Sequence, residues 1–187
     1  MSDRPLRADA RRNRDRLLEV AVQAFSTDGP DVALESIART AGVGIGTLYR
    51  HFPTREALVE AAYRSELERL CDSAGELLAA GDPAVALRAW MDRFVDYMTT
   101  KHGMSEALRM VIASGGNPFS HSRDKLTEAV TTLIEAGIRA GVVRTDVPAM
   151  DVLTSLSGIT LAAGDAAQRE QAGRLLDLLM DGLRPRS

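Results

Sequence analysis

The chain has 187 residues, of which 45% are hydrophobic and only 4% aromatic. Alanine, leucine and arginine abound while runs of β-branched residues are scarce, so we expect an all-α protein with enough apolar material for a well-buried core. One cysteine excludes an internal disulfide, and this cysteine and the three histidines do not stand at metal-ligand spacing. We therefore expect no metal site and no cofactor.

The net charge of −3 is unevenly distributed along the chain. Residues 1–55 hold nine arginines and seven acids, and residues 1–16 alone hold six arginines and three acids. This basic excess suits an arm that faces phosphates, and a disordered, solvated tail explains it equally well. The sequence does not open with a secretory leader pattern, which favours a cytoplasmic location.

Strong breakers divide the first half of the chain into predicted helices. Apolar residues recur at helical spacing through residues 17–25, and Asp28-Gly29-Pro30 ends that helix. Two short helices follow on either side of a tight turn at residues 42–46. Thr54 is a good N-cap for a long helix, which Gly81-Asp82-Pro83 ends.

The second half reads as one helix after another. Apolar residues at helical spacing predict helices through residues 87–98, 104–112, 126–138, 150–161 and 175–183, with a loop at 115–118, a connector at 142–147 and Asp165 between the last two helices. Residues 152–164 are uncharged, but they are too few to span a bilayer, so we expect no membrane partner. The last two helices are rich in apolar and small residues, including Gly158 and Ala162, which permit close approach between helices. We expect a homodimer interface there; packing within one domain is the alternative.

Residues 33–55, ALESIARTAGVGIGTLYRHFPTR, are the most informative segment. On a helix over residues 46–52, Leu48 and Phe52 share one narrow sector, which faces the core, and Arg50 lies roughly opposite. The outward half then carries Thr, Tyr, Arg and His side chains. These side chains suit a DNA duplex, because they can hydrogen-bond to base edges and phosphates.

This segment and its flanks resemble the DNA-binding domain of the tetracycline-repressor (TetR) family. The residues that carry the resemblance are LESIARTAGV, followed by GVGIGTLYRHFPTREALVEAAY. The resemblance covers residues 9–68, with the helix-turn-helix motif at about 33–52. It implies an N-terminal three-helix DNA-binding domain, preceded by a flexible arm at residues 1–8. It also implies a helical ligand-binding and dimerisation domain at residues 69–187.

The resemblance also implies roles for single residues. Carried over by position, Ile45, Gly46 and Thr47 would face bases, Tyr49, His51 and Arg55 would hold phosphates, and Arg50 could touch either. Arg11, Arg12 and Arg14 would add nonspecific grip.

The chain departs from the family pattern at two helix starts. It has Ala33 where Thr is common and Gly44 where Ser is common, and each change removes a hydroxyl that could cap the helix and contact a phosphate. This puts the contribution of the second helix to DNA affinity in doubt. Glu35 would accept a hydrogen bond from a cytosine amino group or face solvent, and we favour solvent.

The sequence says least about the ligand. An apolar effector cavity inside the second domain is the hypothesis, although ordinary core packing explains the same residues more simply. Its candidate lining residues are Trp90, Phe94, Met98, Met104, Met110 and Phe119.

The resulting hypothesis is a dimeric repressor that binds a palindromic operator and is released by a small-molecule effector. An activator or co-regulator of the same fold is the first alternative. An enzyme with a vestigial DNA-binding motif is the second, and no catalytic triad, phosphate loop or metal cluster in the sequence favours it. We assign no catalytic residue.

Overall fold

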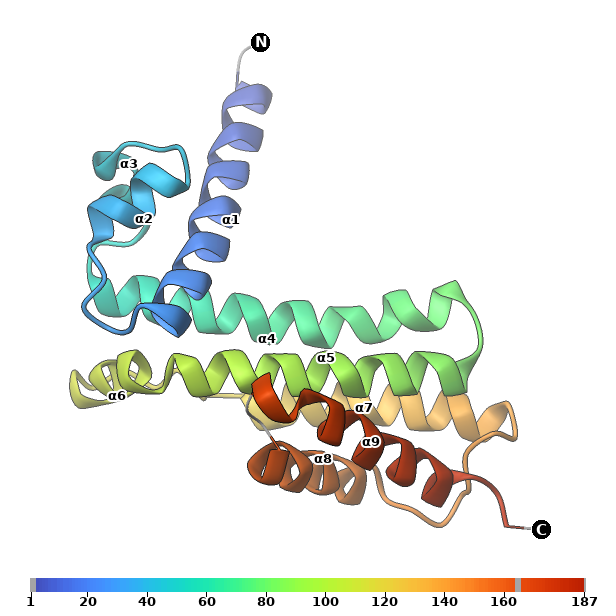
Figure 1. Ribbon diagram of the computed structural model, residues 1–187. Helices are drawn as coiled ribbons and strands as arrows, with labels where there is room; N and C mark the ends of the chain where they lie inside the picture. Colours follow the sequence, from blue (N-terminus) through green and yellow to red (C-terminus); the bar gives the residue numbers. More distant parts are fainter. Residues whose placement is uncertain (1–2, 164–165, 187) are drawn as a thin grey trace. The chain divides into compact units, whose positions relative to one another are not determined.

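The computed structural model describes residues 3–163 and 166–186, which are helical with short connections and contain no strand (Figure 1). The all-α prediction is therefore confirmed. The helices are α1 (Asp3–Thr27), α2 (Leu34–Thr40), α3 (Ile45–His51), α4 (Arg55–Ala80), α5 (Pro83–Gly103), α6 (Ser105–Ala113), α7 (Ser122–Arg139), α8 (Ala149–Ala163) and α9 (Arg169–Leu183), with a 3₁₀ turn, η1, at Ala166–Gln168.

Local chemistry accounts for the end of α1 and for the starts of α4 and α5. The backbone at Gly29, just after α1, has a φ of +85°, a conformation that glycine adopts without strain. The Thr54 hydroxyl accepts a hydrogen bond from the Ala57 N–H at 3.1 Å and so caps α4, as predicted. The Asp82 carboxylate accepts two hydrogen bonds from backbone N–H groups in the first turn of α5.

Two predicted features involve residues beyond the described ranges. The predicted flexible arm spans residues 1–8, of which residues 1 and 2 are not described, while α1 already begins at Asp3. Asp165, predicted between the last two helices, also lies outside the described residues.

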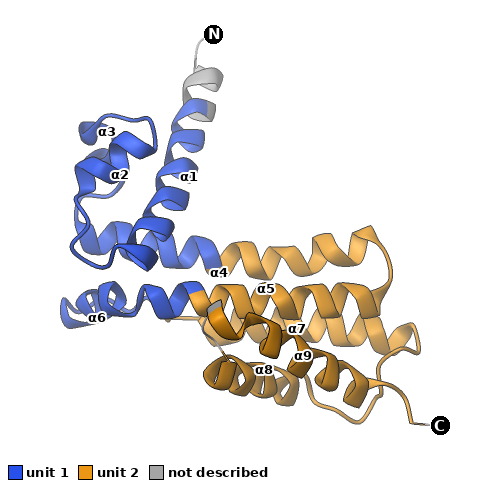
Figure 2. Cartoon of the chain, in the orientation of Figure 1, with its two compact units in different colours: residues 1–66, 100–118 blue, residues 67–99, 119–187 orange. Residues whose placement is uncertain are grey.

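The chain forms two compact units (Figure 2). Unit 1 consists of residues 1–66 and 100–118, and unit 2 of residues 67–99 and 119–187. The first break, between residues 66 and 67, lies within α4. The segment 100–118, which includes α6, joins unit 1 although it lies far along the chain.

Unit 1 is built around α1, α2 and α3, which contact one another pairwise. Large side chains that are fully or almost fully buried hold these helices and the start of α4 together, and they include Leu17, Phe25, Ile37, Leu48 and Leu58. A core of this kind fixes the orientation of a short helix that would not be stable alone.

In unit 2, α7 packs on α8 and α8 on α9. Trp90 and Leu133 are fully buried there. The connector after α7 is fixed at both ends, because Val143 packs against Gly137 and the Arg144 N–H donates to the Leu183 carbonyl at 2.8 Å. This backbone bond ties the connector to the end of α9.

Candidate nucleic-acid interface

A compact turn joins α2 to α3. Gly42 follows α2 with a φ of +70°, and its N–H donates to the Arg39 carbonyl while the Val43 N–H donates to the Ala38 carbonyl at 2.9 Å. These bonds form a Schellman motif, which requires the left-handed conformation that glycine favours. The Arg16 guanidinium adds a 3.3 Å bond from α1 to the carbonyl of Ala41. The turn therefore has little freedom, and α3 follows α2 at a defined angle.

The burial pattern of α3 agrees with the predicted sector. Leu48 is fully buried, and Phe52, one turn later, is buried as well. Of the residues between them, Tyr49 and Arg50 are exposed and His51 is half-buried. Two apolar anchors thus hold the helix, and its polar side chains lie on the surface of unit 1.

The Arg50 side chain folds back along the outside of α3. Its Nε donates to the Gly46 carbonyl at 3.1 Å and its Nη2 to the Thr47 hydroxyl at 3.3 Å. These bonds hold the guanidinium and the hydroxyl side by side on the surface. Such a pair offers a neighbouring duplex several donors and an acceptor in one place.

Neither helix start in the motif has a side-chain cap. Ala33 and Gly44 precede α2 and α3, and neither makes a side-chain cap hydrogen bond. A Cβ placed at Gly44 or at Gly46 would meet no atom of the chain within 4 Å. Packing within the protein does not require glycine at these two positions, so they leave the start of α3 open to close approach from outside.

Arg11, Arg12 and Arg14 lie on the surface of α1, and each has a partner. Arg11 lies 3.9 Å from Asp15, and Arg12 pairs with Asp9. The Arg14 guanidinium lies over the ring of Phe52, 5.7 Å from its centroid. This cation–π contact places Arg14 beside the C-terminal end of α3. No sequence signal singles it out from the other two.

Arg55 at the start of α4 is half-buried and bonded to the backbone. Its Nη1 donates to the carbonyls of Pro30 at 2.8 Å and Val32 at 2.7 Å, and its guanidinium lies 6.0 Å from the centroid of the Phe25 ring. The sequence does not predict this contact with the backbone before α2, because it joins positions 23 and 25 residues apart.

The six candidate effector residues differ in burial and in unit. In unit 2, Trp90 and Phe94 are buried on α5 with their ring centroids 5.8 Å apart, Met98 is half-buried, and Phe119 is exposed. The indole N–H of Trp90 donates to the carbonyl of Leu70 at 3.0 Å. The other two belong to unit 1, where Met104 is buried and Met110 exposed.

Two surface hollows of unit 2 are lined by other residues. One, of about 330 Å³, is lined from α4 and α7, and the other, of about 490 Å³, from α5 and α9. None of the six candidates lines either of these two hollows. The first contains Cys71, whose pKa burial raises to about 11 against the opposing charge of Lys125, so this thiol stays protonated at neutral pH.

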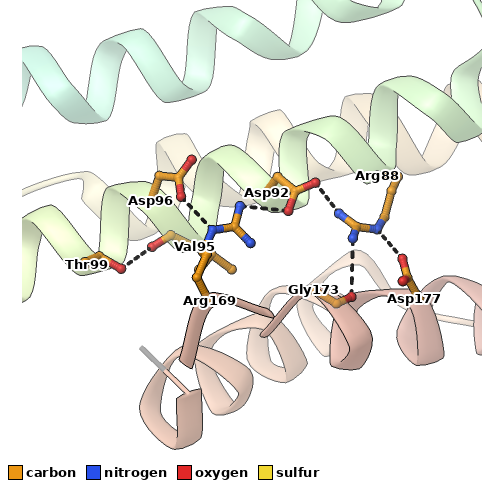
Figure 3. A network of polar contacts seen from close by, with 8 residues as sticks. All are labelled: Arg88, Asp92, Val95, Asp96, Thr99, Arg169, Gly173 and Asp177. Atoms are coloured by element: carbon orange, nitrogen blue, oxygen red, sulfur yellow. Dashed lines mark hydrogen bonds and ion pairs between the residues drawn. The ribbon is translucent and has the colours of Figure 1, made fainter. Parts of the chain in front are cut away.

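A chain of ion pairs joins α5 to α9 within unit 2 (Figure 3). Arg88 pairs with Asp92 on its own helix and with Asp177 on α9 at 2.8 Å. Arg169, the first residue of α9, reaches Asp92 at 2.9 Å and Asp96 at 3.0 Å. Asp92 is thus shared by two arginines. The four-residue spacing of Arg88 and Asp92 indicates their pair within α5, but no sequence signal indicates the pairs with Asp177 and Arg169 on α9.

The outer faces of α8 and α9 carry exposed leucines. Leu161 is 90% exposed and Leu178 is 67% exposed. A Cβ at Gly158 on α8 or at Gly182 on α9 would meet no neighbouring atom within 4 Å. Large apolar side chains beside open glycines are typical of a surface that another helix can cover closely.

The described part of the chain holds no cluster of metal-ligating side chains. Its histidines, cysteine and carboxylates form no group of three or more that could hold a metal ion. Of the helices that the structure describes, none combines the length and the apolar character that crossing a bilayer requires.

Both parts of the chain match known families. Residues 17–62 match the family described as "Bacterial regulatory proteins, tetR family", and residues 82–185 match "Transcriptional regulator SbtR-like, C-terminal domain". The solved structure of a TetR transcriptional regulator from Streptomyces coelicolor is 56% identical, with a TM-score of 0.90 over 93% of this chain and 99% of that one. A TetR transcription regulatory protein from Mycobacterium vanbaalenii is 36% identical, with a TM-score of 0.79 over 97% and 100%.

A curated relative aligns over about a third of the chain. An HTH-type transcriptional regulator from Staphylococcus aureus is 36% identical over 64 residues, which are 34% of this chain and 35% of that protein. The match thus spans about a third of that relative's length. The resemblance found in the sequence is confirmed by the two family matches and by the two structures similar over nearly the whole chain. This chain belongs to the TetR family of DNA-binding transcriptional regulators.

Proposed function

We propose that the protein is a cytoplasmic repressor that binds a palindromic operator as a homodimer and leaves it when a small molecule binds unit 2. The observation that carries this proposal is the arrangement of buried and exposed side chains on α3. Two buried anchors, Leu48 and Phe52, hold a helix whose surface bears adjacent Thr, Tyr, Arg and His side chains. A major groove admits a helix of this kind.

The proposed contacts follow the position of each residue on α3. Ile45, Gly46 and Thr47 lie in its first turn and would face base edges, where the helix start is open. Tyr49 and His51 would hold phosphates. Arg50 would bind either a base edge or a phosphate, after release from its hydrogen bonds to Gly46 and Thr47.

Selection of bound duplexes from a random DNA pool tests the operator. A dimer with two α3 helices predicts a motif with two inverted half-sites, spaced about one helical turn or somewhat more. Retention of all sequences alike by the folded protein would contradict the operator, although it would leave nonspecific DNA binding.

The exposed apolar faces of α8 and α9 support the homodimer. Light scattering of the purified protein should give twice the chain mass. Leu161→Glu places a charge on a 90% exposed side chain, so it should leave the fold intact and shift the protein toward monomer. Val85→Glu on α5 is the matched control, because Val85 is an apolar side chain that is 67% exposed and lies outside α8 and α9, and it should leave the dimer unchanged. A Leu161→Glu protein that remains dimeric would place the interface elsewhere.

The apolar interior of unit 2 supports an effector, and Trp90 provides the measurement because it is the only tryptophan. We expect a neutral, largely apolar compound to change its fluorescence and to lower affinity for the selected duplex over the same concentration range. A reporter gene behind that duplex then separates repressor from activator, since deletion of the regulator raises the output of a repressed promoter. Lower output on deletion would identify an activator.

A further inference from the structure

Arg55 occupies a position where the family resemblance implies a phosphate contact, but its geometry points to another role. We propose that Arg55 is a positioning residue for DNA binding. It fixes the connection between α1 and α2, and through it the start of α2 and the setting of α3. The expected effect of Arg55 on DNA affinity rests on the proposed operator binding. Its expected effect on the start of α2 in the DNA-free protein does not.

The hydrogen bonds of Arg55 carry the argument. Its Nη1 has two hydrogens and makes two bonds, to the carbonyls of Pro30 at 2.8 Å and Val32 at 2.7 Å. Bonds from a charged donor are stronger than those between neutral groups. The guanidinium also lies over the Phe25 ring of α1, which limits its movement. A phosphate would have to compete with these contacts or use the remaining donors.

The connection between α1 and α2 needs such a support. The segment passes through Gly29, with its positive φ, and reaches α2 at Ala33, which makes no side-chain cap bond. In a typical helix a cap hydroxyl or carboxylate would secure this start. Here the securing bonds come from Arg55 to the two residues on either side of Asp31.

Displacement of α2 would reach α3 through the turn between them. The Schellman bonds around Gly42 and the bond from Arg16 to the Ala41 carbonyl make that turn rigid. A loosened α2 start therefore changes the angle of α3 as a whole. Removal of the Arg55 side chain should weaken every interaction of α3 with DNA together, without abolishing any particular phosphate interaction.

The first test uses the protein without DNA. Hydrogen–deuterium exchange of residues 33–41 is compared between wild type, Arg55→Ala and Arg55→Lys. We expect exchange to rise about tenfold in Arg55→Ala, because the start of α2 opens locally while the rest of unit 1 stays protected. We expect Lys to restore little, since its single ammonium lacks the planar fork that spans two carbonyls over a ring.

The second test measures the salt dependence of binding to a duplex retained in the selection. Arg55→Ala should lower affinity about tenfold with the slope of log affinity against log salt unchanged, because the same number of phosphates is neutralised. Arg50→Ala on α3 is the comparison, and removal of its charge should flatten the slope if it holds a phosphate.

The outcomes separate the two roles. Faster exchange in the DNA-free variant with an unchanged slope supports positioning. Unchanged exchange, a slope smaller by about 0.9 for the one phosphate that each Arg55 would have neutralised, or about 1.8 for the dimer, and full recovery with Lys would overturn it. If Arg55→Ala fails to fold, Arg55→Lys decides by exchange and affinity: faster exchange with lower affinity supports positioning, and wild-type values of both overturn it. If the wild type retains no duplex, the proposed function fails while the exchange result still decides the role of Arg55.

Discussion

Asp92 is the centre of the ion-pair network between α5 and α9, and Asp92→Asn tests how much that network stabilises unit 2. The substitution keeps the size of the side chain and removes the charge that Arg88 and Arg169 share. Exposed ion pairs contribute about 0.2–1 kcal/mol each. The side chains of Arg88 and Arg169 are only 25% and 37% exposed, so two pairs at the upper end of that range give about 1–2 kcal/mol.

A further effect adds to this change. Arg169 is the first residue of α9, where the helix dipole disfavours a positive charge by about 0.3–1 kcal/mol at low salt. Asp92 offsets that charge in the wild type. Asp177→Asn is the matched control, since Asp177 pairs with Arg88 but is 68% exposed. Removal of the Asp177 charge should lower the free energy of unfolding by under about 0.5 kcal/mol.

Trp90 makes the measurement specific to unit 2. Trp90 is the only tryptophan and is fully buried in that unit, so tryptophan fluorescence follows the unfolding of unit 2 in urea. All variants are compared at one protein concentration, because association of subunits would add to apparent stability. We expect a lower midpoint for Asp92→Asn than for Asp177→Asn, and a smaller difference in 1 M salt, where the Debye length is about 3 Å.

Equal unfolding midpoints for the two variants would refute this reasoning. They would mean that Asp92 stabilises unit 2 no more than the more exposed Asp177, although Asp92 pairs with two arginines. A destabilisation that persists unchanged at high salt would attribute the effect to packing rather than charge. The double variant Asp92→Asn with Arg169→Gln should cost less than the sum of the single changes, by about 0.5–1 kcal/mol.

Three further predictions concern other parts of the chain. Thr47→Ala should alter base preference at one operator position, whereas Tyr49→Phe should weaken binding to all sequences alike, as repeat selection with each variant would reveal. Gly103→Ala should destabilise unit 1 by about 1–3 kcal/mol in urea unfolding followed by circular dichroism, because its Cβ would lie 2.6 Å from a backbone oxygen of α1. The Arg144 hydrogen bond lowers the pKa of Asp146 to about 2, so the stability that Asp146→Asn removes should be seen above the ordinary value of 3.8 and vanish as the pH falls through about 2. Indistinguishable selection profiles for Thr47→Ala and Tyr49→Phe would contradict the first prediction, and an unchanged unfolding midpoint for Gly103→Ala would contradict the second. A stability difference between wild type and Asp146→Asn that does not depend on pH would contradict the third.

The local features of this protein could be read from its sequence. Helix ends at Asp28-Gly29-Pro30 and Thr54 follow from backbone conformation and capping, which depend on neighbouring residues only. The inward placement of Leu48 and Phe52 follows from the helical period. The TetR resemblance was also readable, because the motif is a continuous segment of the chain.

The tertiary structure alone decided which distant residues meet. Periodicity shows that a helix has an apolar face, but not which element covers it, so the membership of α6 in unit 1 could not be predicted. The roles of arginines were equally hidden, since a long flexible side chain can reach many partners. Arg55 on two carbonyls, Arg14 on a ring and Asp92 between two arginines are contacts whose partners only the packed chain brings within reach.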